Sequence, residues 1–335
     1  GNYNVVVGDE AGTAITTGDY NVALGYNSLI AHTTGASNTA IGAQALMSNT
    51  TAASNVAVGI SALKLNTTGA NNTAVGANAL DANTTAANNV AVGYKSLYLN
   101  TTGAQNVSMG ASSLYTNTTG ASNVAVGHQA LALNTTASNN TAIGFESLAA
   151  NTTGTDNVAF GTYALDANTT ASQNTAVGAR SLSANTTGHS NVTLGAYALQ
   201  VNTTGNYNVG IGRNTMVANT TGSNNIAVGS YALDANTTGA ANVAIGYNSL
   251  TANTTASNNT AVGYVALLAN TTGTQNASFG SYSMDVNTTG SNNAAFGHAA
   301  LNTNSTGADN TSIGAGSLAA NTTASNNTAL GSASL

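Results

Sequence analysis

The sequence predicts an all-β fold, a parallel β-solenoid of about twenty coils with 17 residues in each coil. Three observations predict it: glycine recurs on every seventeenth residue from Gly8 to Gly331, asparagine stands four residues before each of these glycines, and a short apolar segment joins the two. A 17-residue unit is too short for a pair of helices, and its Gly, Asn and Thr residues have low helix propensity. Each unit should therefore be one coil that stacks on its neighbours.

The glycine column marks a fixed point in every coil. No other residue ever replaces these glycines, which implies either a positive φ angle or no room for a Cβ atom. By contrast, the site after each N-T-T sequence accepts Gly69 as well as Ala52, so it requires a small residue rather than a left-handed backbone. The first eight structural glycines are Gly8, Gly25, Gly42, Gly59, Gly76, Gly93, Gly110 and Gly127.

The asparagine column is equally regular. We expect these residues to lie at turns, where their side chains satisfy local backbone groups and stack as an amide ladder along the solenoid. The first six are Asn4, Asn21, Asn38, Asn55, Asn72 and Asn89.

The segment between the asparagine and the glycine alternates large and small residues, as in Val124-Ala125-Val126. Alternation with period two is typical of a strand with one buried face, and we expect its Val and Ile residues to lie inside the coil. A second buried apolar residue is expected four residues after each glycine. Leucine stands there, with Met216 and Met284 as the large replacements and Gly12 as the exception.

The middle strand position holds alanine in most coils and never a charged or long residue. If the Val and Ile side chains face inward, the side chains of this middle column face outward. A position that faced water would hold as many residue types as the two positions after each glycine do. We therefore infer a second packed surface against another chain. A single-chain solenoid with an unusually tight strand face is the alternative.

The composition excludes several classes of function. Only 4% of residues are charged, the net charge is −6, and four cationic side chains are too few to neutralise a nucleic-acid backbone. Cysteine is absent, which removes disulfides and thiolate metal sites. No stretch approaches the roughly 18 apolar residues of a membrane-spanning helix. We expect no nucleic-acid partner, no membrane insertion by this segment and no cofactor.

The array does not resemble an enzyme. A catalytic site requires dissimilar residues at one place, whereas a repeat array presents the same surface many times. The histidines occupy different repeat positions or lie many coils apart, and the carboxylates that follow the leucine column are separated by several coils. These residues are His32, His128, His189 and His298, and Asp81, Asp166, Asp234 and Asp285. We predict neither a catalytic nor a metal site.

The N-T-T sequence also matches the acceptor pattern for N-glycosylation. A polar turn with a stacked threonine row is the alternative interpretation. The same row suggests an ice-binding solenoid as a minor alternative, although two consecutive threonines of a strand point to opposite faces, so only one faces outward. The candidate glycan acceptors include Asn49, Asn66, Asn83, Asn100 and Asn117.

Aromatic residues and the first coil are the main irregularities. Tyrosines at variable positions can stack on sugars or protein partners, or fill gaps between chains. The first coil, residues 1–17, has Val6 in the middle of its strand and Ile15 where N-T-T asparagine should be. We interpret it as a cap or junction, with sequence drift as the alternative. The candidate surface-binding tyrosines are Tyr163, Tyr197, Tyr231 and Tyr264.

The pieces N-V-A-V-G, N-T-A-I-G and N-V-A-L-G, followed by a small residue and leucine, resemble the head repeats of YadA-like trimeric autotransporter adhesins and the N-T-A-I-G repeats of phage tail-fibre-like proteins. The resemblance covers residues 1–335 as a single repeat array. It implies a left-handed parallel β-roll and a side-by-side homotrimer, with strand Val and Ile inside each roll and small residues near the threefold axis. The 17-residue coil is longer than is usual in adhesin heads, which keeps a monomeric two-layer or triangular coil as an alternative.

The expected function is that of a structural or adhesive fibre segment, a rigid extracellular rod on a cell or virion surface. Its partners would be further copies of the chain and a glycan or protein receptor on a host surface. A self-assembling extracellular filament subunit, with or without glycans, is the alternative. Because Gly1 opens inside a repeat and Leu335 stops partway through a coil, we expect the sequence to be a fragment of a longer chain.

Overall fold

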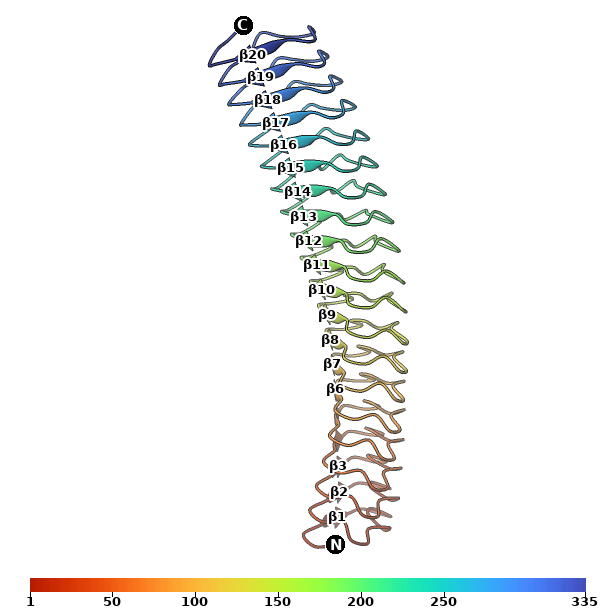
Figure 1. Cartoon of the computed structure of the whole chain (residues 1–335). Coiled ribbons are helices and arrows are strands. Elements are labelled where there is room, and N and C mark those ends of the chain that lie inside the picture. The colour runs from red at the N-terminus through yellow and green to blue at the C-terminus, as the bar shows by residue number, and fades with distance from the viewer. The chain divides into compact units, whose positions relative to one another are not determined.

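The computed structural model describes residues 1–335, and it confirms the all-β parallel solenoid. Every coil contributes one three-residue strand, and there is no helix, so no helix is long and apolar enough to cross a membrane. The chain divides into two compact units, Gly1–Ser172 and Gln173–Leu335. Within each unit, one strand per coil stacks in chain order (Figure 1).

Ten strands lie in each unit. In the first unit they are β1 (Val5–Val7), β2 (Val22–Leu24), β3 (Thr39–Ile41), β4 (Val56–Val58), β5 (Thr73–Val75), β6 (Val90–Val92), β7 (Val107–Met109), β8 (Val124–Val126), β9 (Thr141–Ile143) and β10 (Val158–Phe160). In the second unit they are β11 (Thr175–Val177), β12 (Val192–Leu194), β13 (Val209–Ile211), β14 (Ile226–Val228), β15 (Val243–Ile245), β16 (Thr260–Val262), β17 (Ala277–Phe279), β18 (Ala294–Phe296), β19 (Thr311–Ile313) and β20 (Thr328–Leu330).

Neighbouring strands within each unit pair in parallel and in register, as β8 does with β9, so each residue meets the one that is 17 positions further on. The same offset continues outside the strands. The Thr67 amide donates to the Thr84 carbonyl at 2.8 Å, and the Thr84 amide donates to the Thr101 carbonyl at 3.1 Å. A coil therefore satisfies much of its backbone through the coils beside it, which is the reason a solenoid is stable only as an array.

The direction of the strand side chains contradicts the prediction. The middle residue is buried in β2 through β20, as Ala125 is in β8, whereas the first and third residues point outward. Phe160 and Leu194 at third positions are 52% and 51% exposed. The expectation of Val and Ile inside each coil was wrong, and so was the inference that the small middle column faces another chain.

The contents of the coil explain this direction. The leucine four residues after each glycine is fully buried from Leu29 to Leu301, and Met216 and Met284 replace it in the interior, as predicted. Two buried asparagines complete each layer from that of Asn38 and Asn49 to that of Asn293 and Asn304. A Cβ atom added at Gly210, a middle strand position, would lie 2.5 Å from the Leu199 Cδ1 atom. The middle residue is small because it packs directly against the leucine column.

In the first coil, the large residue stands at the middle strand position and the small residue stands in the leucine column. Val6 takes the middle strand position, and Gly12 stands in the leucine column with a φ of 55°. A Cβ atom on Gly12 would lie 3.2 Å from the Val6 Cγ2 atom and 3.0 Å from the Ile15 Cδ1 atom. The valine and the isoleucine therefore border the place that leucine takes elsewhere, and Val6 remains 43% exposed.

The glycine column satisfies both conditions inferred from its invariance. These glycines have φ values between 121° and 143°, and a Cβ atom on Gly59 would lie 2.6 Å from the Gly76 carbonyl oxygen in the next coil. Gly69, after N-T-T, does not have a positive φ, which agrees with the alanines found at its equivalents.

Candidate interaction surfaces

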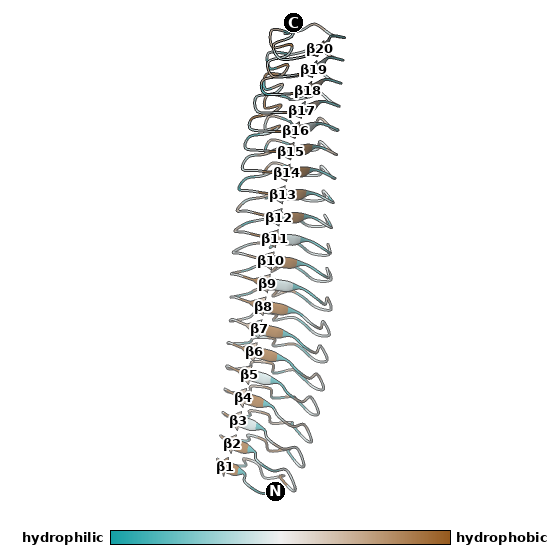
Figure 2. Cartoon of the chain, turned by 60° about the vertical axis from the view of Figure 1, so that its left-hand side comes forward, coloured by the Kyte–Doolittle hydropathy of each residue, from teal (hydrophilic) through white to brown (hydrophobic).

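The outward surface made by the first and third strand residues of each coil is here called the strand face. Its third position holds Val, Leu, Ile, Met or Phe in all twenty coils, and its first position holds Val, Ile, Thr or Ala. No charged residue stands at either position. Within each unit the strands carry most of the apolar colour in Figure 2. On this face the rings of Phe279 and Phe296 stack at 4.8 Å and 5°.

The asparagine that precedes each strand forms the amide ladder that the sequence predicts, here called the first ladder. The Asn72 backbone amide donates to the Asn55 Oδ1 atom at 2.9 Å, and the Asn72 Nδ2 atom donates to the Ala86 carbonyl at 2.9 Å. Each amide therefore links its own coil to the preceding one.

The asparagine of N-T-T forms a second ladder. The Asn83 Nδ2 atom donates to the Asn66 Oδ1 atom at 2.8 Å and to the Ala86 carbonyl at 3.0 Å. Since the Ala86 carbonyl also accepts from Asn72, one backbone oxygen joins the two ladders in this layer. The interior of each coil is thus a hydrogen-bonded amide network beside a single leucine.

The candidate glycan acceptors all belong to the second ladder and are fully buried; they are Asn49, Asn66, Asn83, Asn100 and Asn117. A glycosyltransferase needs the Nδ2 atom at the surface, but in the folded coil this atom is an internal hydrogen-bond donor. The acceptor prediction therefore does not fit the folded array. The alternative interpretation, a polar turn, does.

The two threonines of N-T-T face different ways. The Thr67 hydroxyl donates to the Thr84 carbonyl at 3.0 Å, so the first threonine forms a row bonded along the stack. The second threonine, such as Thr68, is exposed. Only one threonine column per coil is therefore free to face a ligand. The ice-binding hypothesis rests on this column and stays a prediction that thermal hysteresis measurements test.

Aromatic rings on five successive coils of the second unit form a continuous set, here called the aromatic row. Centroid distances between neighbours run from 5.5 to 6.1 Å. One pair, Tyr247 and Tyr264, is stacked, and the other three pairs meet edge to face. At one end the Arg213 Nη1 atom donates to the Tyr231 hydroxyl at 3.4 Å. The members are Tyr231, Tyr247, Tyr264, Tyr282 and His298.

The four candidate surface-binding tyrosines do not form one site. Tyr231 and Tyr264 belong to the aromatic row. Tyr163 lies in the first unit, where it meets the Phe145 ring edge to face at 5.4 Å. Tyr197 lies in the second unit, outside the row. The structure thus places two of the four together and the other two elsewhere.

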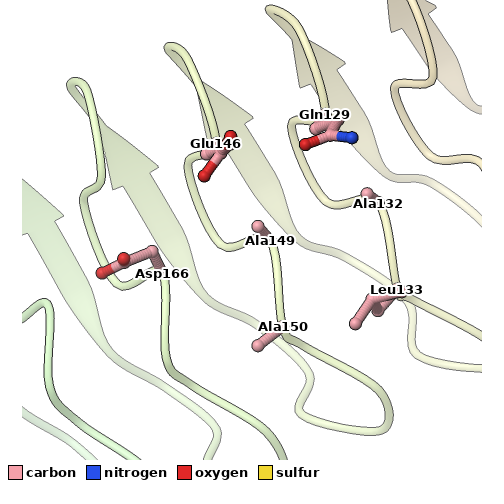
Figure 3. Close-up of a pocket in the computed structure, with 7 residues that line it drawn as sticks. All are labelled: Gln129, Ala132, Leu133, Glu146, Ala149, Ala150 and Asp166. Carbon is pink, nitrogen blue, oxygen red and sulfur yellow. The ribbon is translucent and has the colours of Figure 1, made fainter.

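A shallow hollow of about 290 Å³ lies over three successive coils of the first unit. Its residues are Gln129, Ala132, Leu133, Glu146, Ala149, Ala150 and Asp166. Figure 3 shows the polar ends of Gln129, Glu146 and Asp166 on three different coils rather than gathered at one point. The lining holds two carboxyl groups, Glu146 and Asp166, and no Ser, Thr, Cys, Lys or His.

Titratable groups are scattered. No three His, Cys, Asp or Glu side chains lie together as a metal site would require. Burial raises the pKa of the Asp81, Asp234 and Asp285 carboxyls, and Lys64 partly offsets this for Asp81. His32 differs from the other three histidines because its side chain is fully buried, in the second ladder.

Comparison with the models of known protein families gives no match, and comparison with curated proteins gives none either. The resemblance to adhesin head repeats is therefore an expectation from the sequence. The function of this chain has to be inferred from the surfaces described above.

Sequence reasoning missed two features, the strand face and the place of His32 in the second ladder. A signal for each was present. The third strand position is large and apolar in every coil, although a column of that kind is equally typical of a core. His32 occupies the place of asparagine in an N-T-T sequence, which is visible from the 17-residue register.

Proposed function

We propose that this chain is a structural segment of an extracellular adhesive fibre in which copies of the chain associate side by side through their strand faces. The third strand column carries the proposal. It points outward, yet it holds a large apolar residue in all twenty coils. A column that faced water would accept polar residues, as the sites after each glycine accept Lys95, Arg213 and Glu146.

Three chains wound left-handedly are the arrangement that the resemblance to adhesin heads implies. The observed side-chain direction changes which residues would meet in such a bundle. The Val, Ile and Phe side chains of the strand face would lie between chains, while the alanines stay inside each coil. Because every copy has the same 17-residue coil, a contact made in one layer recurs in the next, and symmetric copies gain from every repeat.

The adhesive surface would then lie outside the strand face. The aromatic row is the longest exposed run of rings, with Tyr247, Tyr264 and Tyr282 each more than 40% exposed. Tyrosine combines a broad apolar surface with a hydroxyl group and loses little conformational freedom on binding, which suits recognition of a glycan or protein receptor. We propose this row as the part of the segment that meets the receptor.

Sedimentation analysis of the whole chain tests the assembly. We expect a discrete trimer. The variant Val75→Glu/Val92→Glu/Val126→Glu places three carboxylates on the strand face and should sediment as a monomer, because burying an unpaired charge between chains costs several kcal/mol, roughly 3–5 for a fully buried one. Its circular dichroism should match that of the unaltered chain, since these side chains point away from the interior.

The matched control is Thr85→Glu/Thr102→Glu/Thr136→Glu, which adds the same charge to exposed threonines of nearby coils and should remain trimeric. A monomeric unaltered chain, or a trimeric strand-face variant, would overturn the proposal. A polymer distribution would do so as well, in favour of the filament alternative.

A further inference from the structure

His32 takes the place of asparagine in the second ladder. The His32 Nε2 atom lies 2.8 Å from the Gly35 carbonyl oxygen, and the His32 Nδ1 atom lies 2.9 Å from the Asn49 Nδ2 atom. In the regular coils an Nδ2 atom donates to the equivalent carbonyl, and an Oδ1 atom accepts from the next coil, as in Asn66. The imidazole therefore reproduces two of the three contacts of a ladder asparagine and lacks the third, the bond from Nδ2 to the Oδ1 atom of the preceding coil.

The hydrogen bonds fix the protonation state of the ring. The Asn49 Nδ2 atom can only donate, so the His32 Nδ1 atom must accept and carries no hydrogen. The Gly35 carbonyl can only accept, so the His32 Nε2 atom carries the hydrogen. The ring is therefore the neutral tautomer protonated at Nε2.

The second ladder does not continue from His32 into the preceding coil. The residue 17 positions earlier is Ile15, and the backbone keeps the register there, because the Thr16 amide donates to the Thr33 carbonyl at 2.9 Å. Isoleucine offers no side-chain acceptor. An asparagine at position 32 would have two Nδ2 hydrogens, one for Gly35 and one with no partner. The imidazole has one N–H donor and one acceptor, so all its polar atoms are satisfied.

We propose that neutral His32 terminates the second amide ladder and holds the first coils closed in a pH-dependent way. This hydrogen-bonded arrangement of His32 is here called the lock. Protonation would place a hydrogen on Nδ1, directly opposite the Asn49 Nδ2 donor, and would leave a charge in a buried site. The side-chain bond between His32 and Asn49 would be lost from the contacts between these two coils, and the coils on the N-terminal side of Asn49 would open in preference to the rest.

The groups that face the ring are neutral. The two groups that bond to it are the Gly35 carbonyl of the same turn and the Asn49 carboxamide of the next coil. Burial lowers the pKa of His32, and the hydrogen bonds with Gly35 and Asn49 oppose this in part. The charged groups of the first two coils lie on the exposed or half-buried surface; they are the Gly1 amino group, Asp9, Glu10 and Asp19. None of them contributes to the shift of the His32 pKa.

The sign of the pH effect follows from the direction of this shift. The pKa of His32 in the folded state lies below the ordinary value of about 6.5. At pH values between these two, the unfolded state therefore binds more protons than the folded state. The lock is therefore complete above about pH 6.5 and weakens as the pH falls from 6.5 towards the folded-state value. The opening equilibrium should rise by up to about tenfold per pH unit in this window.

Hydrogen exchange on the full chain at several pH values between 7.5 and 4.5, corrected for intrinsic exchange rates, tests the proposal. Peptides from residues 1–48 should lose protection as the pH falls below 6.5, and peptides from residues 51–172 should not. His32→Asn should remove this pH dependence and lower protection at pH 7.5, because one buried N–H lacks a partner. Adding Ile15→Asn should restore the protection by supplying an acceptor. His128→Asn alters an exposed histidine and should behave like the unaltered chain.

Equal protection of residues 1–48 at every pH, or an undiminished pH dependence in His32→Asn, would overturn the proposal. A second measurement needs no variant. In ¹⁵N spectra of the histidines in the unaltered chain, His32 should remain the neutral Nε2-protonated tautomer below pH 6.5. A His32 signal that titrates at or above pH 6.5, or that reports the Nδ1-protonated tautomer, would also sink it.

Discussion

Asn100 shows how much one side chain contributes to the interior of a coil. Its Nδ2 atom donates to the Asn83 Oδ1 atom at 3.0 Å and to the Gly103 carbonyl at 2.9 Å, and its Oδ1 atom accepts from the Asn117 Nδ2 atom at 2.8 Å. A carboxamide has both a double donor and an acceptor, whereas a carboxylate lacks the donors and an aliphatic group lacks both. This requirement explains why asparagine, a residue that is usually exposed, fills two buried columns.

Replacing Asn100 with alanine should be strongly destabilising. The change leaves the Asn117 donor and the Asn83 acceptor without partners in a buried layer, and each such group costs about 1–3 kcal/mol. We expect the free energy of unfolding to fall by about 3–5 kcal/mol in urea titrations followed by circular dichroism. Thr102→Ala, at an exposed site two residues away, should change it by less than about 0.5 kcal/mol. Equal effects of the two changes would contradict the ladder as a source of stability.

At the scale of the single coil, the sequence was sufficient to predict the strand, its register, the buried leucine and the first amide ladder. It was not sufficient to predict which strand side chains point inward, because either the Val and Ile residues or the alanines between them could form a buried face. Packing decides between them: with a leucine and two asparagines in each layer, only a small residue fits against Leu199 or its equivalents. The role of His32 likewise needed hydrogen-bond distances, since the register alone places the residue but not its partners.

The glycine column gives a prediction at this scale. Gly127 has a φ of 134°, and a Cβ atom there would lie 2.7 Å from the Gly144 carbonyl carbon. Gly127→Ala therefore combines a strained backbone with a collision against the next coil, and we expect a loss of about 3 kcal/mol or more in thermal or urea unfolding. Ala137→Gly, at the site that accepts both residues, should cost no more than about 1 kcal/mol. A tolerated Gly127→Ala variant would contradict the close approach of neighbouring coils.

At the scale of the whole molecule, the array is built from layers that bond mainly to the adjacent layers. Strand pairing, both amide ladders and the threonine row all connect residues 17 positions apart. In such an array, stability is close to a sum over coils and over contacts between neighbours. The number of coils in a unit is therefore not fixed by packing, which distinguishes this chain from a globular domain.

Deletion of one complete coil tests this view. Removing residues 72–88 joins Asn71 to Asn89 and keeps every column in register, so the thermal midpoint should change by only about 2 °C or less. Removing residues 72–80 joins Asn71 to Asp81 and leaves half a coil, which interrupts both ladders and the leucine column. Scanning calorimetry should show a large loss for this second variant. Similar midpoints for the two deletions would be inconsistent with a strict layered register.

The amide ladders also give the stack a chemical polarity. In both ladders the donor belongs to the later coil and the acceptor to the earlier one, as in the bonds from Asn72 to Asn55 and from Asn83 to Asn66. The ladder bonds therefore all run in one direction along the unit, so that each Oδ1 acceptor faces the following coil and the second ladder stops at His32. Two stacks that continue each other's ladders can therefore join only head to tail.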